Sequence, residues 1–569
     1  MLASELAMGT PKSLPITSLE SVHIKRRTRK LSLSLRSSKE NANEHRPPVN
    51  SRKHRREKYA FLSILFLANL AVSLMSMNFS RFYWILLPIT LFRPFVDSTE
   101  ITLLVIFYLI RRLYPTPPKV PDTPENLAYL LTCYNETSTE LTRSLASLAD
   151  QQNLETHNKA VIIVCDGRCN GRGMEKTTAD QLKEDVIENA TTTSIPSAYT
   201  AWDGKPMDVE LIRGTFKSLD VLCIVKEENR GKRDSLILIR SFLHKLNQQA
   251  TNPHQPIGIF SPQLFTHMRH FFQSLSMPTV QHIIGIDADT RFDPHCITNL
   301  VQTARESPKI VGVSGFVLAD PTITSPFSLP FIYQTTEYRT GQIRRRFRQS
   351  LMTRKVTCLP GCCQLLRVVE ETCGDELLSR FGYYPLESDT LFRTIQSMTS
   401  EDRDHICLML QMHKDVQTRQ CLAARAYTSV PHSAVVFLRQ RRRWTLGPIV
   451  SDSLLALRGE TGVAERMAAV ASVWNWASTL SMLFAPFFRA PLDPTTARLC
   501  SSLIAYRNTW DYTTVLLSST SLLQLCQNIV GCILVSQLAP TAGVIVHIYS
   551  LMYLDDFQWG KMRGDVKGV

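Results

Sequence analysis

The chain has 569 residues, of which 44% are hydrophobic and 20% are charged, so its composition is that of an ordinary globular protein and does not by itself indicate a membrane protein. Its net charge of +14 is uneven: residues 1–58 contain 14 Lys/Arg against 5 Asp/Glu, which predicts a disordered basic tail, and the lack of aromatic residues in this tail argues against nucleic-acid binding. The 14 cysteines show no zinc-ligand spacing, which favours reduced, buried thiols in a cytosolic domain.

An uncharged stretch, residues 59–77, follows the tail and is long enough to cross a bilayer of about 30 Å. The basic cluster Arg52 to Lys58 directly precedes it, so the positive-inside rule places the N-terminus in the cytoplasm. A second apolar region, residues 82–110, is interrupted by charges and prolines. Two transmembrane helices within residues 59–113 would return the chain to the cytoplasm; the alternative is a hairpin that only dips into the bilayer.

A Pro-rich linker, residues 114–126, precedes a mixed region, residues 127–447, that has no apolar run of membrane-spanning length. In this region LAYLLTCYNE and KAVIIVCDG look like strands that end in loops, and LTRSLASLADQ looks like an amphipathic helix. Such alternation predicts an α/β fold with a mostly parallel sheet and helices on both faces. Ligands bind such sheets at the carboxyl ends of the strands. Four acids fall there: Glu136, Asp166, Asp287 and Asp289.

Asp287 and Asp289 form an Asp-Ala-Asp sequence after the strand-like segment HIIGID. The strand period of two predicts that both carboxylates lie on one side of the strand end. Two carboxylates there could share Mg²⁺ or Mn²⁺, whose other ligands would be phosphate oxygens. Loop acids of this kind also cap helices, so the sequence alone leaves both interpretations open.

Three further motifs occur in the same region. Lys232 follows a glycine at a predicted helix start, which suits an anionic ligand, although a solvated turn would look the same. Asp402, in the sequence Glu-Asp-Arg, could be a general base if a neighbouring cation keeps it ionised. The sequence QRRRW, Gln440 to Trp444, combines arginines suited to phosphate with a ring suited to a sugar, but it could also be a basic anchor at a membrane surface.

The chain becomes apolar again after Gly447. Residues 448–463 could lie on the membrane surface, and residues 464–569 contain low-charge stretches at 464–488, 512–535 and 538–554, which predict two or three further membrane spans.

Taken together, these motifs resemble those of the processive family 2 glycosyltransferases, and among them the fungal chitin synthases. The resemblance runs from about residue 127 to Trp444 and returns near the C-terminus. It is carried by LTCYNET (Leu131 to Thr137), CDGR (Cys165 to Arg168), GKRDS (Gly231 to Ser235), DADT (Asp287 to Thr290), VTCLPGC (Val356 to Cys362), EDR (Glu401 to Arg403), QRRRW and the terminal W-G motif in DFQWGKMR (Asp556 to Arg563). It implies a GT-A-like, Rossmann-type cytosolic domain flanked by transmembrane helices.

The resemblance also implies roles for individual residues. Asp402 would be the general base for the acceptor hydroxyl, and Asp289 would bind Mg²⁺ or Mn²⁺ on the diphosphate. The donor, UDP-N-acetylglucosamine, would be bound by Thr132, Glu136, Asp166, Lys232 and Asp287. The acceptor or diphosphate would be bound by Gln440, Arg443 and Trp444, in a channel shaped by Pro360, Gly361 and Cys362.

The implied reaction inverts the anomeric centre in one displacement and extends a β-1,4-linked chitin chain, which would leave the cytosol between the flanking helices. The implied location is the plasma membrane, with the catalytic domain in the cytoplasm and no nucleic-acid partner; a homodimer is left open. The alternatives are a hyaluronan- or cellulose-like synthase, in which the donor sugar differs, and a catalytically weak membrane paralogue.

Overall fold

The computed structural model describes residues 49–112, 123–171, 173–457, 461–481, 494–519 and 521–557. All of them belong to one compact unit of the chain. Three sequence expectations lie wholly or largely outside the described residues: the tail up to residue 48, most of the Pro-rich linker and the terminal W-G motif.

The described strands form a ten-stranded sheet in the order β3-β4-β5-β2-β1-β6-β9-β8-β10-β7. Its strands are β1 (Asn126–Cys133), β2 (Asn158–Cys165), β3 (Glu188–Thr200), β4 (Pro206–Phe216), β5 (Leu219–Lys226), β6 (His282–Asp287), β7 (Thr290–Phe292), β8 (Ile310–Ala319), β9 (Gln364–Arg367) and β10 (Gln417–Thr428). The run β5-β2-β1-β6 is parallel, as the buried strands β1, β2 and β6 predicted. The sheet as a whole is mixed, not mostly parallel, because β3, β4 and β5 form antiparallel hairpins and β9 inserts antiparallel between β6 and β8.

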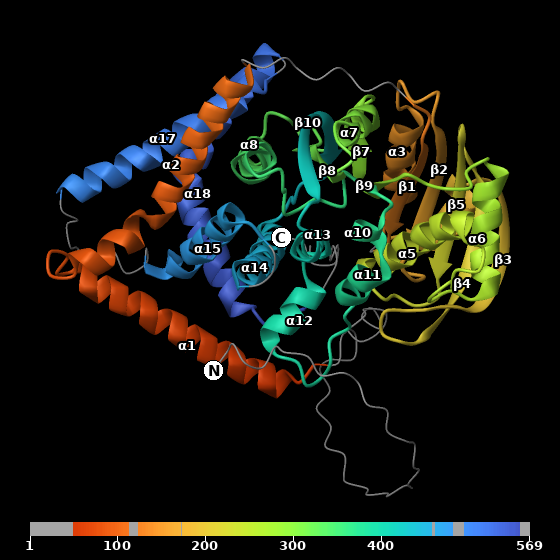
Figure 1. Ribbon diagram of the computed structural model, residues 1–569, viewed down its shortest axis with the longest axis horizontal. Coiled ribbons are helices and arrows are strands. Elements are labelled where there is room, and N and C mark those ends of the chain that lie inside the picture. The colour runs from red at the N-terminus through yellow and green to blue at the C-terminus, as the bar shows by residue number, and fades with distance from the viewer. Residues whose placement is uncertain are drawn as a thin grey trace, which may run out of the picture. The chain divides into compact units, whose positions relative to one another are not determined.

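Helices cover both faces of this sheet, as expected (Figure 1). On β1, Tyr129 and Leu131 pack with α3 (Ser138–Ala149) and α7 (Cys296–Arg305) on one face. Their neighbours Ala128 and Leu130 pack with helices on the other face, α5 (Lys232–Thr251) and α6 (Pro262–Ser274). The alternation follows from the strand period, and complete burial of both faces explains why the sequence of β1 is continuously apolar.

Further helices connect the sheet to the rest of the chain. They are α4 (Thr178–Gln181) with the π-helical turn η1 (Leu182–Val186), α8 (Leu329–Gln342) with the π-helical turn η2 (Ile343–Phe347), α9 (Arg348–Met352), α10 (Glu370–Cys373), α11 (Asp375–Phe381), α12 (Leu391–Met398), α13 (Glu401–Met412) and α14 (Ala434–Leu457). The boundary expected after Gly447 therefore falls inside α14, and the first part of the predicted interfacial segment is the continuation of that helix.

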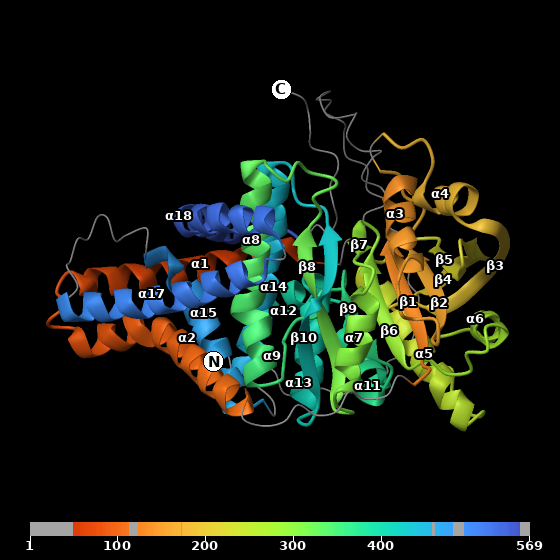
Figure 2. The same cartoon turned by 90° about the horizontal axis from the view of Figure 1, so that it is seen from above.

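A second group of helices packs together at the other side of the unit (Figure 2). It comprises α1 (Ser51–Ser76), α2 (Tyr83–Arg112), α15 (Val463–Ala477) with the short turn η3 (Ser478–Leu480), α17 (Pro494–Leu517) and α18 (Leu522–Met552). In this group α17 contacts both α2 and α18, and α15 contacts α2. Among the described helices, α1 and α18 alone combine the length and apolar character needed to cross a membrane. The second predicted span corresponds to α2, which does not meet these criteria. Its buried Asp97 pairs with Arg507 of α17 at 3.4 Å.

The predicted division of the C-terminal region is wrong. The stretches 512–535 and 538–554 were expected as separate spans, but α17 ends earlier, at Leu517, and residues 522–552 form the single helix α18. Ser521 begins that helix by accepting the backbone N–H of Gln524, which is an N-cap arrangement that the apolar pattern does not reveal. Pro540 lies inside α18 without ending it.

The basic cluster Arg52 to Lys58 forms the first turns of α1, whereas the sequence placed residues 51–58 in a disordered tail. Lys53 donates to the carbonyl oxygen of Ser388 at 2.5 Å, and the Glu57 carboxylate accepts the backbone N–H of Leu391 at 2.6 Å. Lys58 pairs with Asp555 at 2.6 Å. Contacts more than 300 residues apart thus order a segment whose local composition favours disorder.

Candidate active site

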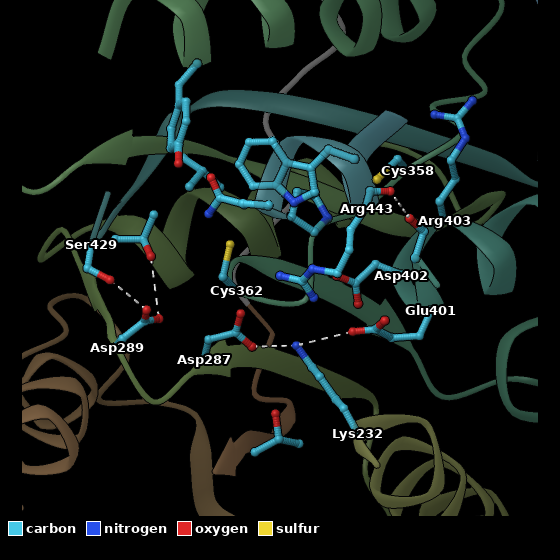
Figure 3. A pocket seen from close by; sticks show the side chains of 18 of the residues that line it. Lys232, Asp287, Asp289, Cys358, Cys362, Glu401, Asp402, Arg403, Ser429 and Arg443 are labelled. Carbon is cyan, nitrogen blue, oxygen red and sulfur yellow. Dashed lines mark hydrogen bonds and ion pairs between the residues drawn. The ribbon is translucent and has the colours of Figure 1, made fainter. Parts of the chain in front are cut away.

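A cavity of about 590 Å³ lies at the carboxyl ends of β1, β2 and β6 (Figure 3). Its volume is within the range of small-molecule sites. The structure brings together in its wall Thr132, Glu136, Asp166, Lys232, Asp287, Asp289, Pro360, Cys362, Asp402, Gln440, Arg443 and Trp444. These are all the predicted site residues except Gly361, whose backbone N–H donates to the Asp402 carboxylate.

The sheet edge supplies one side of the cavity. Strand β1 lies between β2 and β6, so the connections diverge on either side of it and leave a crevice at the strand ends. Thr132 of β1 is the register partner of Asp287 of β6, which places both at the same level of that edge. Glu136 folds back onto its own loop, where it accepts the backbone N–H of Tyr134 at 2.7 Å.

Asp166, at the end of β2, is held by a buried ion network. Lys226 is fully buried between Asp166, at 2.5 Å, and Asp234, at 3.0 Å. The backbone N–H of Arg230 also donates to the Asp166 carboxylate. Because a buried cation must be paired, Lys226 makes these two acids structurally interdependent, and Asp166 presents a fixed carboxylate to the cavity.

The two acids of the Asp-Ala-Asp sequence have different partners. Asp287 is the last residue of β6 and accepts from Lys232 at 2.6 Å. Asp289 lies in the following turn and accepts from the hydroxyls of Ser429 at 2.9 Å and Thr428 at 3.5 Å. Figure 3 shows both carboxylates at the cavity but directed to these separate partners.

These two carboxylates fit a Mg²⁺ or Mn²⁺ ion that completes its coordination with diphosphate oxygens. Within the described residues no group of three or more His, Cys, Asp or Glu side chains could hold a metal. Mg²⁺ does not require such a group, since it commonly binds one or two carboxylates together with substrate phosphates and water. The Ser429 hydroxyl orients Asp289 in the manner of a residue that supports a metal ligand.

Lys232 connects the sheet edge with the opposite wall. It is the first residue of α5, directly after Gly231, whose φ of +83° suits a glycine. Its ammonium group lies 2.6 Å from Asp287 and 3.9 Å from Glu401. Burial alone would lower the pKa of Lys232, but the carboxylates of Asp287, Asp402 and Glu401 together raise that pKa, so the side chain stays charged.

Asp402 is the second residue of α13 and lies opposite the sheet edge. Burial, together with the neighbouring acids Glu401 and Asp287, raises its pKa to about 6, against the opposing effect of the Lys232 charge. Its Oδ2 accepts the backbone N–H of Gly361 at 2.8 Å. Its Oδ1 is buried and has no hydrogen-bond partner among the described residues. A carboxylate with one oxygen held and the other free is suited to accept a proton.

Gly361 is a glycine because of this contact. A Cβ at this position would lie 2.7 Å from Asp402 Oδ1 and 2.9 Å from Lys232 Nζ, closer than side chains approach one another. The sequence predicted Gly361 as part of a channel wall; the structure gives it the more specific position of a backbone donor to Asp402.

Helix α14 supplies the remaining wall. Gln440, Arg443 and Trp444 are separated by three and four residues, so they share one face of the helix. Burial lowers the pKa of Arg443, and the nearby Glu401 carboxylate opposes that shift. Figure 3 shows the Arg443 guanidinium directed towards Asp402 and Asp287. Trp444 remains 47% exposed, so its ring is available for a ligand.

The other arginines of QRRRW differ in surroundings. Arg441 pairs with Glu337, and its guanidinium lies 4.6 Å from the ring centre of Trp444, so it also fixes that ring. Arg442 pairs with Asp556 at 2.8 Å. Both partners lie more than 100 residues away in the sequence, so the local pattern of QRRRW does not identify them.

Sequence reasoning missed several residues of the cavity wall, among them Ser429, Thr428, Arg345 and Glu401. Ser429 directly follows β10, so the strand-end argument used for β1, β2 and β6 would have found it had residues 417–428 been identified as a strand. Arg345 belongs to the sequence IRRRF, where local pattern alone does not say which arginine faces the cavity.

Two solved structures show distant similarity. The mannosyltransferase PcManGT from Pyrobaculum calidifontis, in a complex with GDP-Man and Mn²⁺, aligns with a TM-score of 0.38 at 12% identity, covering 82% of this chain and 98% of that one. TarS 1–349 of S. aureus aligns with a TM-score of 0.30 at 10% identity, covering 77% and 93%. Similarity at this level does not define a function.

Sequence relatives are much closer. A family model described as chitin synthase matches residues 221–457, which include Lys232, Asp402 and Trp444. Chitin synthase 8 of Gibberella zeae is 36% identical over 460 residues, covering 79% of this chain and 68% of that protein. Chitin synthase 8 of Verticillium dahliae is 34% identical, covering 70% and 69%. Because such identity extends over most of both chains, this protein belongs to the fungal chitin synthases and is a glycosyltransferase.

Proposed function

We propose that the chain transfers N-acetylglucosamine from UDP-N-acetylglucosamine to the non-reducing end of a growing β-1,4-linked polymer, with inversion at the anomeric carbon and Asp402 as the base. The observation that carries this proposal is the Asp402 carboxyl, which has a pKa of about 6 and a buried Oδ1 without a partner among the described residues. It lines the same cavity as the sheet-edge acids and the α14 residues.

The donor binds along the sheet edge in this proposal. Thr132, Glu136 and Asp166 line the uridine end, and Lys232 and Asp287 lie between that end and Asp402. Asp289, with Asp287 beside it, would hold Mg²⁺ or Mn²⁺, and such an ion would supply positive charge to the leaving diphosphate. Arg443 adds a fixed guanidinium on the opposite side, where a planar donor suits phosphate oxygens.

The acceptor sugar lies against α14. The exposed Trp444 ring offers an apolar face to the sugar, and Gln440 offers an amide to its hydroxyls. Pro360 and Cys362 form the adjacent wall. An acceptor hydroxyl placed beside Asp402 Oδ1 loses its proton to that oxygen while its own oxygen attacks the anomeric carbon, so a single displacement is sufficient.

We further propose that the polymer grows processively and is passed across a membrane between the helices that flank the cavity. Helices α1 and α18 have the length and apolar character for this. In the proposed arrangement the catalytic region faces the cytoplasm, where sugar nucleotides are made, and the plasma membrane is crossed.

A donor screen on membranes that contain the full chain tests this proposal. UDP-N-acetylglucosamine should support UDP release and a product that chitinase digests, whereas UDP-glucose should not. Asp402→Asn should lower the rate by 10²-fold or more, because general base catalysis contributes about that much. The exposed Asp415 offers a matched control, and Asp415→Asn should retain the rate.

Preference for UDP-glucose, or a product that resists chitinase, would refute the proposed substrate. Full activity of Asp402→Asn would refute the proposed base. Absence of UDP release with every sugar nucleotide would instead favour a catalytically weak member of the family.

A further inference from the structure

Helices α13 and α14 touch at one point more closely than ordinary side chains permit. A Cβ on the buried Gly447 would lie 1.9 Å from Ser400 Oγ and 2.3 Å from Ser400 Cβ. Glycine inside a helix costs about 1 kcal/mol relative to alanine, so its presence at the centre of α14 needs a physical reason. The close approach of Ser400 supplies one.

Ser400 is the residue from which α13 starts. Its φ is +54°, a left-handed conformation, and its carbonyl oxygen accepts the backbone N–H groups of Arg403 at 3.0 Å and Asp404 at 2.9 Å. Asp402 lies within that same turn. Any displacement of Ser400 is therefore carried directly to Asp402.

Two contacts connect this turn to α14. The Ser400 hydroxyl donates to the backbone carbonyl oxygen of Arg443 at 3.3 Å. On the far side of Asp402, Arg403 pairs with Asp452 of α14, and both side chains are almost completely buried. Figure 3 shows the Arg403 side chain directed away from the Asp402 carboxylate. Asp402 is thus held from both sides by contacts that do not themselves involve its carboxylate.

We propose that Gly447 is a positioning residue: its contact with Ser400, together with the Arg403–Asp452 ion pair, sets the distance between the Asp402 carboxylate and the Arg443 and Trp444 side chains of α14. This inference rests on the proposed role of Asp402. It adds that the spacing of base and acceptor site is fixed by the contact between two helices, at a residue that does not line the cavity.

Gly447→Ala tests the proposal. The added methyl group must push Ser400 away, and a misplacement of about 1 Å at a reacting group costs about 10²-fold in rate. We expect kcat to fall by about that factor while the KM for the donor stays within about twofold, because the sheet-edge residues do not move. The thermal unfolding temperature in detergent should stay close to that of the unmodified chain.

The pair of residues also allows a rescue. In Ser400→Gly/Gly447→Ala both clashing atoms are gone, and the next atom near the new Cβ is Thr399 Oγ1 at 3.4 Å, an ordinary contact. Glycine tolerates the positive φ of residue 400. The double variant loses the Ser400–Arg443 hydrogen bond, worth about 1 kcal/mol, but it keeps the Arg403–Asp452 ion pair and relieves the clash, so kcat should recover to within a few-fold of the unmodified chain.

Gly543→Ala is a matched control, because Gly543 lies in α18 and a Cβ there would meet no atom within 4 Å. It should keep full kcat. Asp452→Asn is an independent test of the second contact and should lower kcat with little change in donor KM.

An unchanged kcat in Gly447→Ala would overturn the proposal, as would a loss that Ser400→Gly fails to rescue. A fall in kcat with an equal loss of donor binding or thermal stability would also overturn it, since that is the result of general destabilisation. The donor screen on the unmodified chain tests the proposed substrate separately. If the unmodified chain uses another donor, kcat of these variants is compared with that of the unmodified chain on that donor.

Discussion

The position of Lys232 predicts a measurable change in the pH dependence of the reaction. Asp402 acts as a base only in its deprotonated form, so kcat/KM should fall tenfold per pH unit below the pKa of this carboxyl in the free enzyme. With that pKa at about 6, the unmodified chain should be half-maximally active near pH 6.

Lys232→Met should move this acid limb to higher pH. Gly361 lies between the two charged groups. A Cβ on this glycine would lie 2.7 Å from Asp402 Oδ1 and 2.9 Å from Lys232 Nζ, so the carboxylate and the ammonium group are close neighbours. At a separation of about 5 Å and an effective dielectric constant of about 20, their attraction is about 3 kcal/mol, or about 2 pKa units. The loss of this attraction raises the Asp402 pKa, and half-maximal activity should move to about pH 8.

Glu401→Gln should act in the opposite direction. The Glu401 carboxylate raises the pKa of Asp402, so its removal lowers that pKa and extends activity below pH 6. Initial rates of UDP release between pH 5 and pH 9, at donor concentrations below KM, give the pH of half-maximal kcat/KM. This pH does not depend on the maximal value of kcat/KM, which each substitution can also change. If neither variant moves the limb, Asp402 is not the titrating base.

Three further outcomes follow from the site. Ser429→Ala removes the hydroxyl that orients Asp289 and should raise the Mg²⁺ or Mn²⁺ concentration needed for half-maximal activity by about tenfold or more, with the maximal rate less affected. Arg443→Ala should cost far more activity than Arg439→Ala in the same rate assay, since Arg443 lines the cavity and Arg439 does not. Lys226→Met leaves two buried carboxylates without their cation and should destabilise the fold by about 3–5 kcal/mol, measured by denaturant unfolding; an unchanged midpoint would contradict the buried ion network.

Local sequence pattern predicted the sheet edge well because each relevant strand reports its own burial. Strands β1, β2 and β6 each carry an apolar run with an acid at or soon after its end, so Glu136, Asp166 and Asp287 could be assigned to one edge before any contact was known, whereas Thr132 was implied by the family resemblance. The assignment of Asp402 and Trp444 to the same site depended on the family resemblance. Nothing in the spacing of these motifs places α13 and α14 beside the sheet.

The features that were missed depend on contacts between distant parts of the chain. Ordering of the basic cluster requires Ser388 and Leu391, which no local pattern connects to Lys53 and Glu57. The charges in the second apolar region interrupt it without indicating that Asp97 pairs with Arg507, 410 residues later, in addition to its helical neighbour Arg93 at 2.9 Å. Composition reports the cost of burying a charge but not the residue that offsets it.

The charge balance of the cavity gives a physical reason for a metal ion in the proposed reaction. Seven acidic and six basic side chains line the wall. Four of the six basic ones are committed to ion pairs: Lys232 to Asp287 and Glu401, Arg441 to Glu337, and both Arg403 and Arg345 to Asp452. A diphosphate that enters this cavity therefore meets few available positive charges, and its charge grows as the sugar leaves. A divalent ion on Asp289 would reverse that balance at the leaving group, while Lys232 remains paired and keeps Asp402 ionised.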